Sequence, residues 1–139
     1  MSTPKWLTEF TSRVENLRND AFLYNIRPKA ENSNLTKRGA VLILLHDGVR
    51  GPEVLITLRS EGLRSHSGQP SFPGGAIENS ESAIDAALRE SFEEVGLLRE
   101  SVEVLTQLPE LFIPPSNFHV TPILGFWRDP HPLIPEQSE

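Results

Sequence analysis

The sequence has no cysteine, and this absence excludes several classes of protein. Without cysteine there is no disulfide framework, no thiolate zinc site and no cysteine nucleophile. Long apolar runs are missing too: no stretch approaches the roughly 20 apolar residues of a membrane span, and the N-terminus has no apolar run typical of a signal peptide. We therefore expect a soluble, cytoplasmic protein with no membrane partner.

Positive charge is also scarce. The chain has 13 Lys and Arg residues against 19 Asp and Glu, which gives a formal net charge of −6 at pH 7. Proteins that bind nucleic acid or acidic membranes generally carry a basic surface, so we expect no nucleic-acid partner. At 139 residues and 37% hydrophobic content, the chain suits one domain with a real core.

Hydrophobic periodicity predicts a mixed sheet with helices packed on it. Apolar residues from Trp6 to Leu17 recur at helical spacing, which predicts a helix ending near Asn19, and residues 20–37 read as a connecting loop. The apolar runs typical of strands span residues 40–45, 53–60, 102–108 and 118–127. We expect the first two runs to form a hairpin, closed by the turn residues His46, Asp47 and Gly48.

The most informative segment is an acidic helix that precedes Gly96, the residue expected to end it. At about 100° per residue, Glu93 and Glu94 lie within roughly 60° of Glu90. The opposite face carries the apolar residues Ile84, Leu88, Phe92 and Val95. Three carboxylates this close repel one another and call for a cation. An acidic helix is often only a solvated face, but the preceding glycines and Arg89 argue against that reading.

The spacing of this segment resembles the Nudix box, the signature of the Nudix hydrolases. The matching residues are Gly75, Glu81, Arg89, Glu90, Glu93, Glu94, Gly96 and Leu97. One position departs, because Ser91 stands where the family has an aliphatic residue, within the apolar stripe. Its hydroxyl can bond to the carbonyl one turn earlier, so we expect a mild loss of packing and no loss of chemistry.

The resemblance implies a site for Mg²⁺ or Mn²⁺, which prefer carboxylate and phosphate oxygens. The implied metal ligands are Glu90, Glu94, Glu93 and the carbonyl of Gly75. The implied catalytic residues are Glu93, Arg89 and Glu90. Glu93 would be either a further ligand or the general base, and Arg89 would orient a glutamate through charge-assisted hydrogen bonds. Glu81 is expected to tie the loop to the helix.

A second pattern lies upstream and resembles the signature of the coenzyme A pyrophosphatase branch of the Nudix hydrolases. The matching residues are Leu55, Thr57, Arg59, Ser60, Arg64, Gly68, Phe72, Pro73, Gly74 and Gly75. We expect Arg59, Arg64, Gly68 and Gly74 to bind substrate. Arginine grips phosphate with two hydrogen bonds, and glycine lets the main chain approach a phosphate closely. Both arginines could instead be ordinary surface cations.

The implied reaction is hydrolysis of the diphosphate bond of coenzyme A or an acyl derivative, which yields adenosine 3′,5′-bisphosphate and 4′-phosphopantetheine. Two other readings stay open. The box alone would serve a hydrolase of ADP-ribose, nucleotide sugars or other nucleoside diphosphate derivatives, and the chain could instead be an inactive, truncated scaffold that binds a nucleotide. The four histidines have no spacing typical of a ligand set.

The resemblance also implies the fold class, an α/β (α+β) Nudix-type α/β/α sandwich with a mixed sheet. We divide the chain into an N-terminal helix and loop at 1–37, the Nudix domain at 38–128 and a polar, Pro-rich tail at 129–139. The tail shows no pattern for the family's C-terminal strand and helix, so we expect these to be lacking. A sheet face left bare would favour association, and a homodimer would be one way to cover it.

Overall fold

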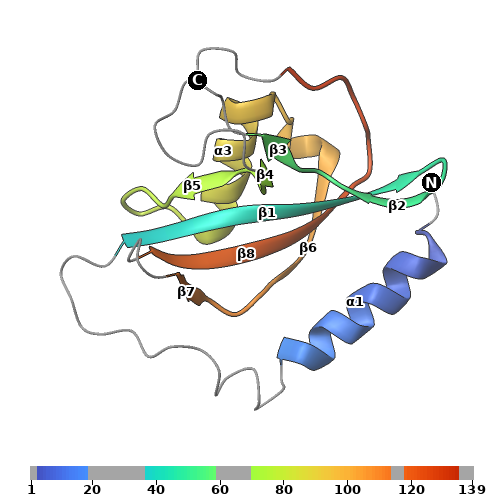
Figure 1. Cartoon of the computed structure of the whole chain (residues 1–139), viewed down its shortest axis with the longest axis horizontal. Coiled ribbons are helices and arrows are strands. Elements are labelled where there is room, and N and C mark those ends of the chain that lie inside the picture. The colour runs from blue at the N-terminus through green and yellow to red at the C-terminus, as the bar shows by residue number, and fades with distance from the viewer. Residues whose placement is uncertain (1–2, 19–36, 59–69, 114–117, 135–139) are drawn as a thin grey trace.

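The computed structural model describes residues 3–18, 37–58, 70–113 and 118–134 (Figure 1). Its elements are α1 (Lys5–Arg18), β1 (Lys37–Gly48), β2 (Gly51–Val54), β3 (Thr57–Leu58), β4 (Pro70–Ser71), β5 (Gly74–Ala76), α3 (Ala83–Val95), the 3₁₀ turn η1 (Arg99–Ser101), β6 (Val102–Gln107), β7 (Leu111–Ile113) and β8 (Phe118–Trp127). Of the loop predicted at 20–37, Lys37 already belongs to β1, and the rest lies outside the described residues, as do the expected binding residues Arg59, Arg64 and Gly68. Within the described part, no helix is long and apolar enough to span a membrane.

The predicted mixed sheet is confirmed, and a parallel pair forms its centre. Strands β1 and β8 run parallel from the pair Lys37 and Phe118 to the pair Leu45 and Phe126. The other strands of this sheet join antiparallel: β2 and β5 pair with β1, and β6 and β7 pair with β8. Strands β3 and β4 form a separate two-stranded ribbon beside it. The central strands coincide with apolar runs of the sequence. A strand that is covered on both faces of the sheet buries apolar side chains on both, so its sequence is nearly continuously apolar.

The predicted hairpin is confirmed only in part. Strand β1 continues through Gly48, so the turn falls at residues 49–50 and not at His46, Asp47 and Gly48. The expected partner strand at 53–60 is also divided. Only residues up to Val54 pair with β1, whereas Thr57 and Leu58 pair with β4. The chain therefore leaves the main sheet after Leu55, whose N–H donates the last bond to the carbonyl of Leu44, at 3.0 Å.

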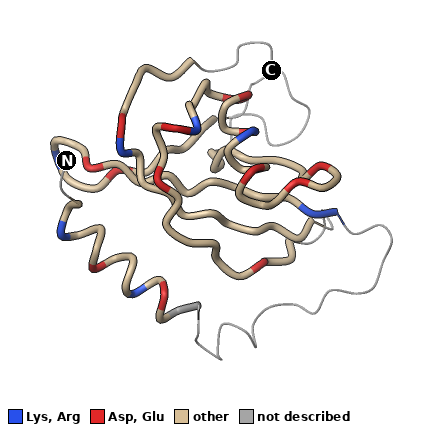
Figure 2. Tube along the Cα trace, turned by 180° about the vertical axis from the view of Figure 1, so that it is seen from behind, with Lys and Arg blue, Asp and Glu red and all other residues tan. Residues whose placement is uncertain are grey.

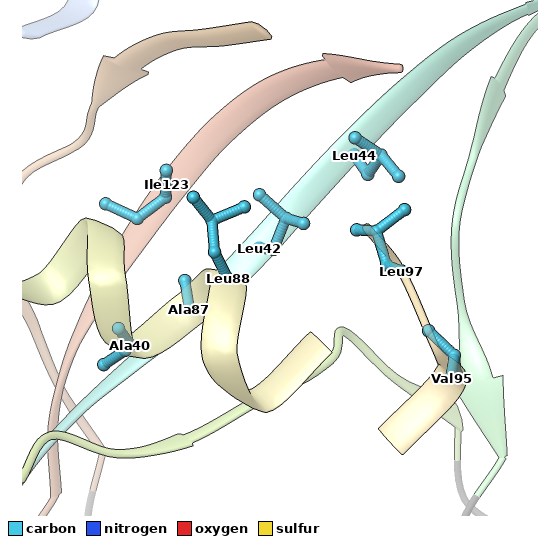
Figure 3. Close-up of a cluster of buried hydrophobic side chains, with 9 residues drawn as sticks. Ala40, Leu42, Leu44, Ala87, Leu88, Val95, Leu97 and Ile123 are labelled. Atoms are coloured by element: carbon cyan, nitrogen blue, oxygen red, sulfur yellow. The ribbon is translucent and has the colours of Figure 1, made fainter. Parts of the chain in front are cut away.

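Two hydrophobic layers cover opposite faces of the sheet. Because side chains alternate along a strand, Leu44 of β1 faces α3 while Leu45 faces α1. The α3 layer is built from Ala40, Leu42, Leu44, Ala86, Ala87, Leu88, Val95, Leu97 and Ile123 (Figure 3). The α1 layer joins Leu7 and Val14 to Leu45, Leu124 and Phe126. The result is the expected α/β/α arrangement.

The expectation of a bare sheet face is wrong for the part of the face that α1 covers. Leu7 and Val14 are buried there, and α1 lies on the side of the sheet away from α3 (Figure 1). The amphipathic spacing of α1 was visible in the sequence, but its docking partner was not, since periodicity shows that a helix has an apolar side and not which surface that side meets.

The apolar face of α3 also differs from the prediction at one residue. Phe92 is 56% exposed, and the buried face consists of Ala86, Ala87, Leu88, Ser91 and Val95. These residues are mostly small, so the helix approaches the sheet closely and a phenyl ring has no room between them. Ser91 is fully buried, and its hydroxyl donates to the carbonyl of Ala87 at 2.7 Å, as expected. Gly96 ends the helix with a φ of 73°, in the left-handed region.

We predict that Ser91→Ala changes the free energy of unfolding by less than about 1 kcal/mol, because the Ala87 carbonyl also takes part in the helix and a back-bonded serine slightly weakens a helix. Ser91→Leu should lower it by about 1–3 kcal/mol, since the fully buried position leaves no room for a larger side chain. Urea unfolding of the three proteins checks both values. A large loss in Ser91→Ala would show that the hydroxyl is a stabilising contact.

Candidate active site

Helix α3 brings two of the three expected carboxylates to the glycine segment before it. Glu90 and Glu94 are one turn apart, and the N–H of Gly74 donates to Oε2 of Glu94 at 3.1 Å. The Glu90 carboxylate lies directly over Gly75, where any Cβ would overlap it. A side chain at Gly75 would displace the Glu90 carboxylate from this position, so glycine leaves the carboxylate room to lie against the main chain. The structure thus brings together Glu90, Glu94, Gly74 and Gly75, four of the residues expected from the sequence.

Arg89 connects the helix to the loop that precedes it. Its guanidinium grips Glu81 with two hydrogen bonds, Nε to Oε2 at 2.8 Å and Nη2 to Oε1 at 3.1 Å. It also donates to Oε2 of Glu93 at 3.1 Å and to the carbonyl of Ala76 at 3.0 Å. Glu81 in turn accepts from the N–H of Glu78 at 3.1 Å. The expected tie between loop and helix through Glu81 is present, and so is the expected bond from Arg89 to a glutamate.

The charge around this site is strongly negative. Between residues 78 and 94 the chain has five glutamates and Asp85, and Arg89 is the one basic residue (Figure 2). Burial raises the pKa of Glu90 above its ordinary value, the nearby charges of Glu93 and Glu78 raise it further, and Arg89 opposes the shift. The hydrogen bonds from Arg89 lower the pKa of Glu81 instead. Arg89, the basic residue of this site, is therefore bound mainly to Glu81. The Glu90 carboxylate is left partly buried and close to other negative charges.

This donor set fits a hard divalent cation. Glu90 and Glu94 present carboxylate oxygens on one side of α3, against Gly74 and Gly75, and oxygen is the ligand that Mg²⁺ and Mn²⁺ prefer. A cation would also relieve the repulsion that raises the Glu90 pKa. In the described ranges, no three His, Asp or Glu side chains already converge on one point, because Glu93 is turned toward Arg89.

The expected substrate-binding residues divide between described and undescribed parts. Gly74 is at the site, whereas Arg59, Arg64 and Gly68 lie outside the described residues. Both ends of their segment are nevertheless placed. Leu58 pairs with Pro70 and Thr57 with Ser71 in the β3–β4 ribbon. Ser71 is three residues before Gly74, so the β3–β4 ribbon leads directly into the glycine segment.

Two contributors were not predicted from the sequence. Ser82 caps α3, and its hydroxyl accepts from the N–H of Asp85 at 3.0 Å. A serine followed three residues later by an acidic residue is a known helix-start signal, so this cap could have been found. The carbonyl of Ala76, which accepts from Arg89, left no signal, because every residue carries a carbonyl.

The described histidines lie apart from this site. His46 is 3.0 Å from a carboxylate oxygen of Glu53, and His119 is 3.1 Å from one of Glu110. The N–H of Leu98 donates to His131 at 3.1 Å. None of these interactions joins a described histidine to Glu90, Glu93 or Glu94.

We predict that Glu81→Gln destabilises the protein at neutral pH and not in strong acid. The pKa of Glu81 is lowered in the folded state, so the carboxylate stabilises the fold fully above the unfolded value of about 4.3 and progressively less as pH falls through the lowered folded value. Urea midpoints between pH 2 and 7 measure this difference. Glu100→Gln, an exposed glutamate in η1, is the control, and an equal effect of both variants at pH 7 would contradict the role of Glu81.

Comparison with known proteins agrees with this geometry. The NUDIX domain profile matches residues 36–132. An uncharacterised Nudix hydrolase named NudL, from Citrobacter koseri, is 43% identical over 101 residues, which are 72% of this chain and 52% of that protein. Nudix hydrolase 3 of Caenorhabditis elegans is 46% identical over 76 residues, 55% of this chain and 32% of that protein.

Solved structures show the same fold. The Nudix hydrolase RenU of M. smegmatis superposes with a TM-score of 0.62 at 24% identity, over 74% of this chain and 67% of that one. The chain spans about half the length of the NudL relative. Because the profile covers the sheet, α3 and the glycine segment that carries the carboxylates, the chain belongs to the Nudix family.

Proposed function

We propose that the chain hydrolyses the diphosphate bond of coenzyme A or an acyl-coenzyme A, with Mg²⁺ or Mn²⁺ as cofactor. The observation that carries the hydrolase proposal is the placement of Glu90 and Glu94 against Gly74 and Gly75, beside a guanidinium bound mainly to Glu81. Arg89 is the only basic residue between residues 78 and 94, where the sequence has five glutamates, so the region keeps a net negative charge that would favour a divalent metal ion, and the ion would in turn bind a diphosphate. The products would be adenosine 3′,5′-bisphosphate and 4′-phosphopantetheine.

Glu90 and Glu94 would hold the metal, with the carbonyl of Gly75 as a further ligand. A bound ion would neutralise part of the negative charge of the diphosphate, and it would lower the pKa of a water molecule coordinated to it. The hydrogen bond from Gly74 orients Glu94, and the raised pKa of Glu90 reflects a carboxylate already partly removed from water. Both features preorganise the ligands before substrate arrives.

Glu93 would be either a further ligand or the general base. Its Oε2 accepts from Nη1 of Arg89 at 3.1 Å, so Oε1 is the atom that would take the proton of the attacking water. The side chain of Glu93 is 53% exposed, which lets water reach it. Arg89 would act as a positioning residue, because it fixes the carboxylate of Glu93 through one oxygen.

The choice of coenzyme A rests on the upstream pattern and on topology. In the sequence, Arg59 and Arg64 belong to the segment that joins β3 to β4. Gly74 follows three residues after the end of β4. Arginine on such a segment suits the 3′-phosphate or the diphosphate of coenzyme A. Other nucleoside diphosphate derivatives, and an inactive nucleotide-binding scaffold, are the competing outcomes of the test.

The first test offers the purified protein coenzyme A, ADP-ribose and a nucleoside triphosphate, each with Mg²⁺ or Mn²⁺. We predict hydrolysis of coenzyme A, and a loss of turnover by orders of magnitude in Glu90→Gln and Glu94→Gln, because each removes a charged ligand. Circular dichroism should show both variants folded, and Glu100→Gln should keep full activity. Preference for ADP-ribose would reassign the substrate, and wild-type turnover in either variant would refute the ligand assignment.

A second test addresses the two arginines. If Arg59 or Arg64 contacts the 3′-phosphate, its replacement by alanine should raise KM for coenzyme A more than KM for dephospho-coenzyme A, because only the first substrate carries that group. Steady-state kinetics on both substrates measures the difference. Equal increases would place that arginine at the diphosphate, and no change would leave it as an ordinary surface cation.

A further inference from the structure

The chain that follows β8 returns to the end of α3. The N–H of Ile134 donates to the carbonyl of Val95, the last residue of α3, at 2.7 Å, and the N–H of Arg128 donates to the carbonyl of Ser101 in η1 at 3.0 Å. The last carbonyls of a helix have no partner within the helix, so the first of these bonds satisfies one of them. Figure 1 shows this chain, in red, curving from β8 back toward α3. We call residues 128–134 the strap.

His131 holds the strap through a ring nitrogen that accepts a hydrogen bond. The N–H of Leu98 donates to Nε2 of His131 at 3.1 Å, and Nδ1 lies 2.9 Å from the carbonyl oxygen of Pro132. A main-chain N–H can only donate and a carbonyl can only accept, so Nε2 carries no proton and Nδ1 carries one. The bond between the strap and Leu98 therefore requires the neutral imidazole.

Packing on both sides fixes where the His131 ring lies. Its centroid is 5.4 Å from a ring centroid of Trp127, and the two planes meet at 86°. The indole N–H of Trp127 donates in turn to Oγ of Ser101 at 3.1 Å. Leu133, two residues after His131, packs on the α3 layer. The ring is therefore held between the end of β8 and the chain that follows α3.

The charged groups around His131 have partners of their own. The titratable and charged residues on the neighbouring elements are His46 of β1, Glu53 of β2, Arg99 and Glu100 of η1, and Arg128 and Asp129 of the strap. Arg99 pairs with Asp85 of α3, and Arg128 pairs with Glu103 of β6. In the described part of the chain, the ring's hydrogen bonds are the two given above, and neither is to a carboxylate that would hold a second proton on it.

His46 contacts the same indole but responds to a proton in the opposite way. Its ring lies 5.6 Å from that of Trp127, and its Nδ1 is 3.0 Å from Oε1 of Glu53. A proton on His46 would strengthen its bond to the carboxylate. A proton on Nε2 of His131 would instead face the N–H of Leu98, and two donors cannot bond to each other. Acid therefore opposes the contact of His131 and not that of His46.

We propose that the strap is a proton-sensitive clamp on the end of α3, closed while His131 is neutral and released in mild acid. Histidine is the side chain whose charge ordinarily changes between about pH 5 and 8. The bond to Leu98 is present above that range and is lost as pH falls through it, because the two facing donors then need water as a partner. Release would loosen the last turn of α3, which carries Glu94.

Hydrogen exchange of single amides, followed by NMR on the full chain, tests the clamp. The two conditions are about pH 7.5 and pH 5.5, on either side of the ordinary histidine value. Protection factors, corrected for the effect of pH on intrinsic exchange, should fall about tenfold at Leu98 and Ile134 in the wild type, because both amides lose their partners. The amide of Leu42, which bonds to the carbonyl of Pro73, is the internal reference and should keep its protection.

Three variants identify the residue that senses the proton. His131→Gln offers an amide oxygen that accepts a bond and does not titrate, so Leu98 and Ile134 should stay protected at both pH values. His131→Ala removes the acceptor, and both amides should exchange fast at both pH values. His46→Gln is the matched control, because it changes the other histidine on Trp127, and it should keep the wild-type response.

Every other outcome overturns the clamp. Unchanged protection in the wild type, or an equal fall in His131→Gln, would show that His131 does not sense the proton. A fall at Leu98 alone would show that the strap stays closed in acid. A fall at Leu42 as large as that at Ile134 would be general acid unfolding, and loss of the response in His46→Gln would assign it to His46.

Discussion

The guanidinium of Arg89 is the interaction on which the acidic site depends. It bonds to three separate parts of the structure: Glu81 in the loop, Glu93 on α3 and the carbonyl of Ala76 at the end of β5. The neighbouring charged groups are carboxylates, and no other Lys or Arg occurs between residues 78 and 94. The Arg89 guanidinium therefore holds the loop, the helix and the strand end together.

The same close packing that builds the core also builds the site. Ala86, Ala87 and Ser91 are fully buried against the sheet, so α3 lies near β1 and near β5, which pairs with β1 through Gly74 and Gly75. At this separation the Glu90 carboxylate reaches over Gly75 and Glu94 reaches the N–H of Gly74. Larger residues on the buried face would move the helix outward and carry both carboxylates away from the glycines.

Much of the fold and of the candidate site could be predicted from the sequence, wherever residues close together in the chain decide the local structure. Strand β8 has the predicted bounds because one largely apolar run spans residues 118–127, and Gly96 ends α3 because a left-handed φ favours glycine. The resemblance to the Nudix box implied that Glu81 ties the loop to the helix and that Arg89 bonds to a glutamate, but not that the two residues bond to each other. The predictions that were wrong concern residues whose structure depends on contacts with residues far away in the sequence. The run at 53–60 divides because Thr57 and Leu58 pair with β4, and Phe92 is exposed because the small residues beside it fit the sheet better. The role of α1 as a cover for the sheet needed tertiary packing, which periodicity does not report.

The parallel pair at the centre of the sheet has a consequence for how the chain folds. Strands β1 and β8 contact along nearly their whole length, yet paired residues such as Lys37 and Phe118 are roughly eighty positions apart in sequence, and such non-local pairing is slow to form. During synthesis, β1 with its hairpin and α3 emerges long before β8, and β6 emerges with no neighbour to pair with. The unpaired edges of β1 and β6 are thus exposed together until residues 118–127 insert between them, which makes the arrival of β8 the step at which the nascent sheet stops being prone to aggregation.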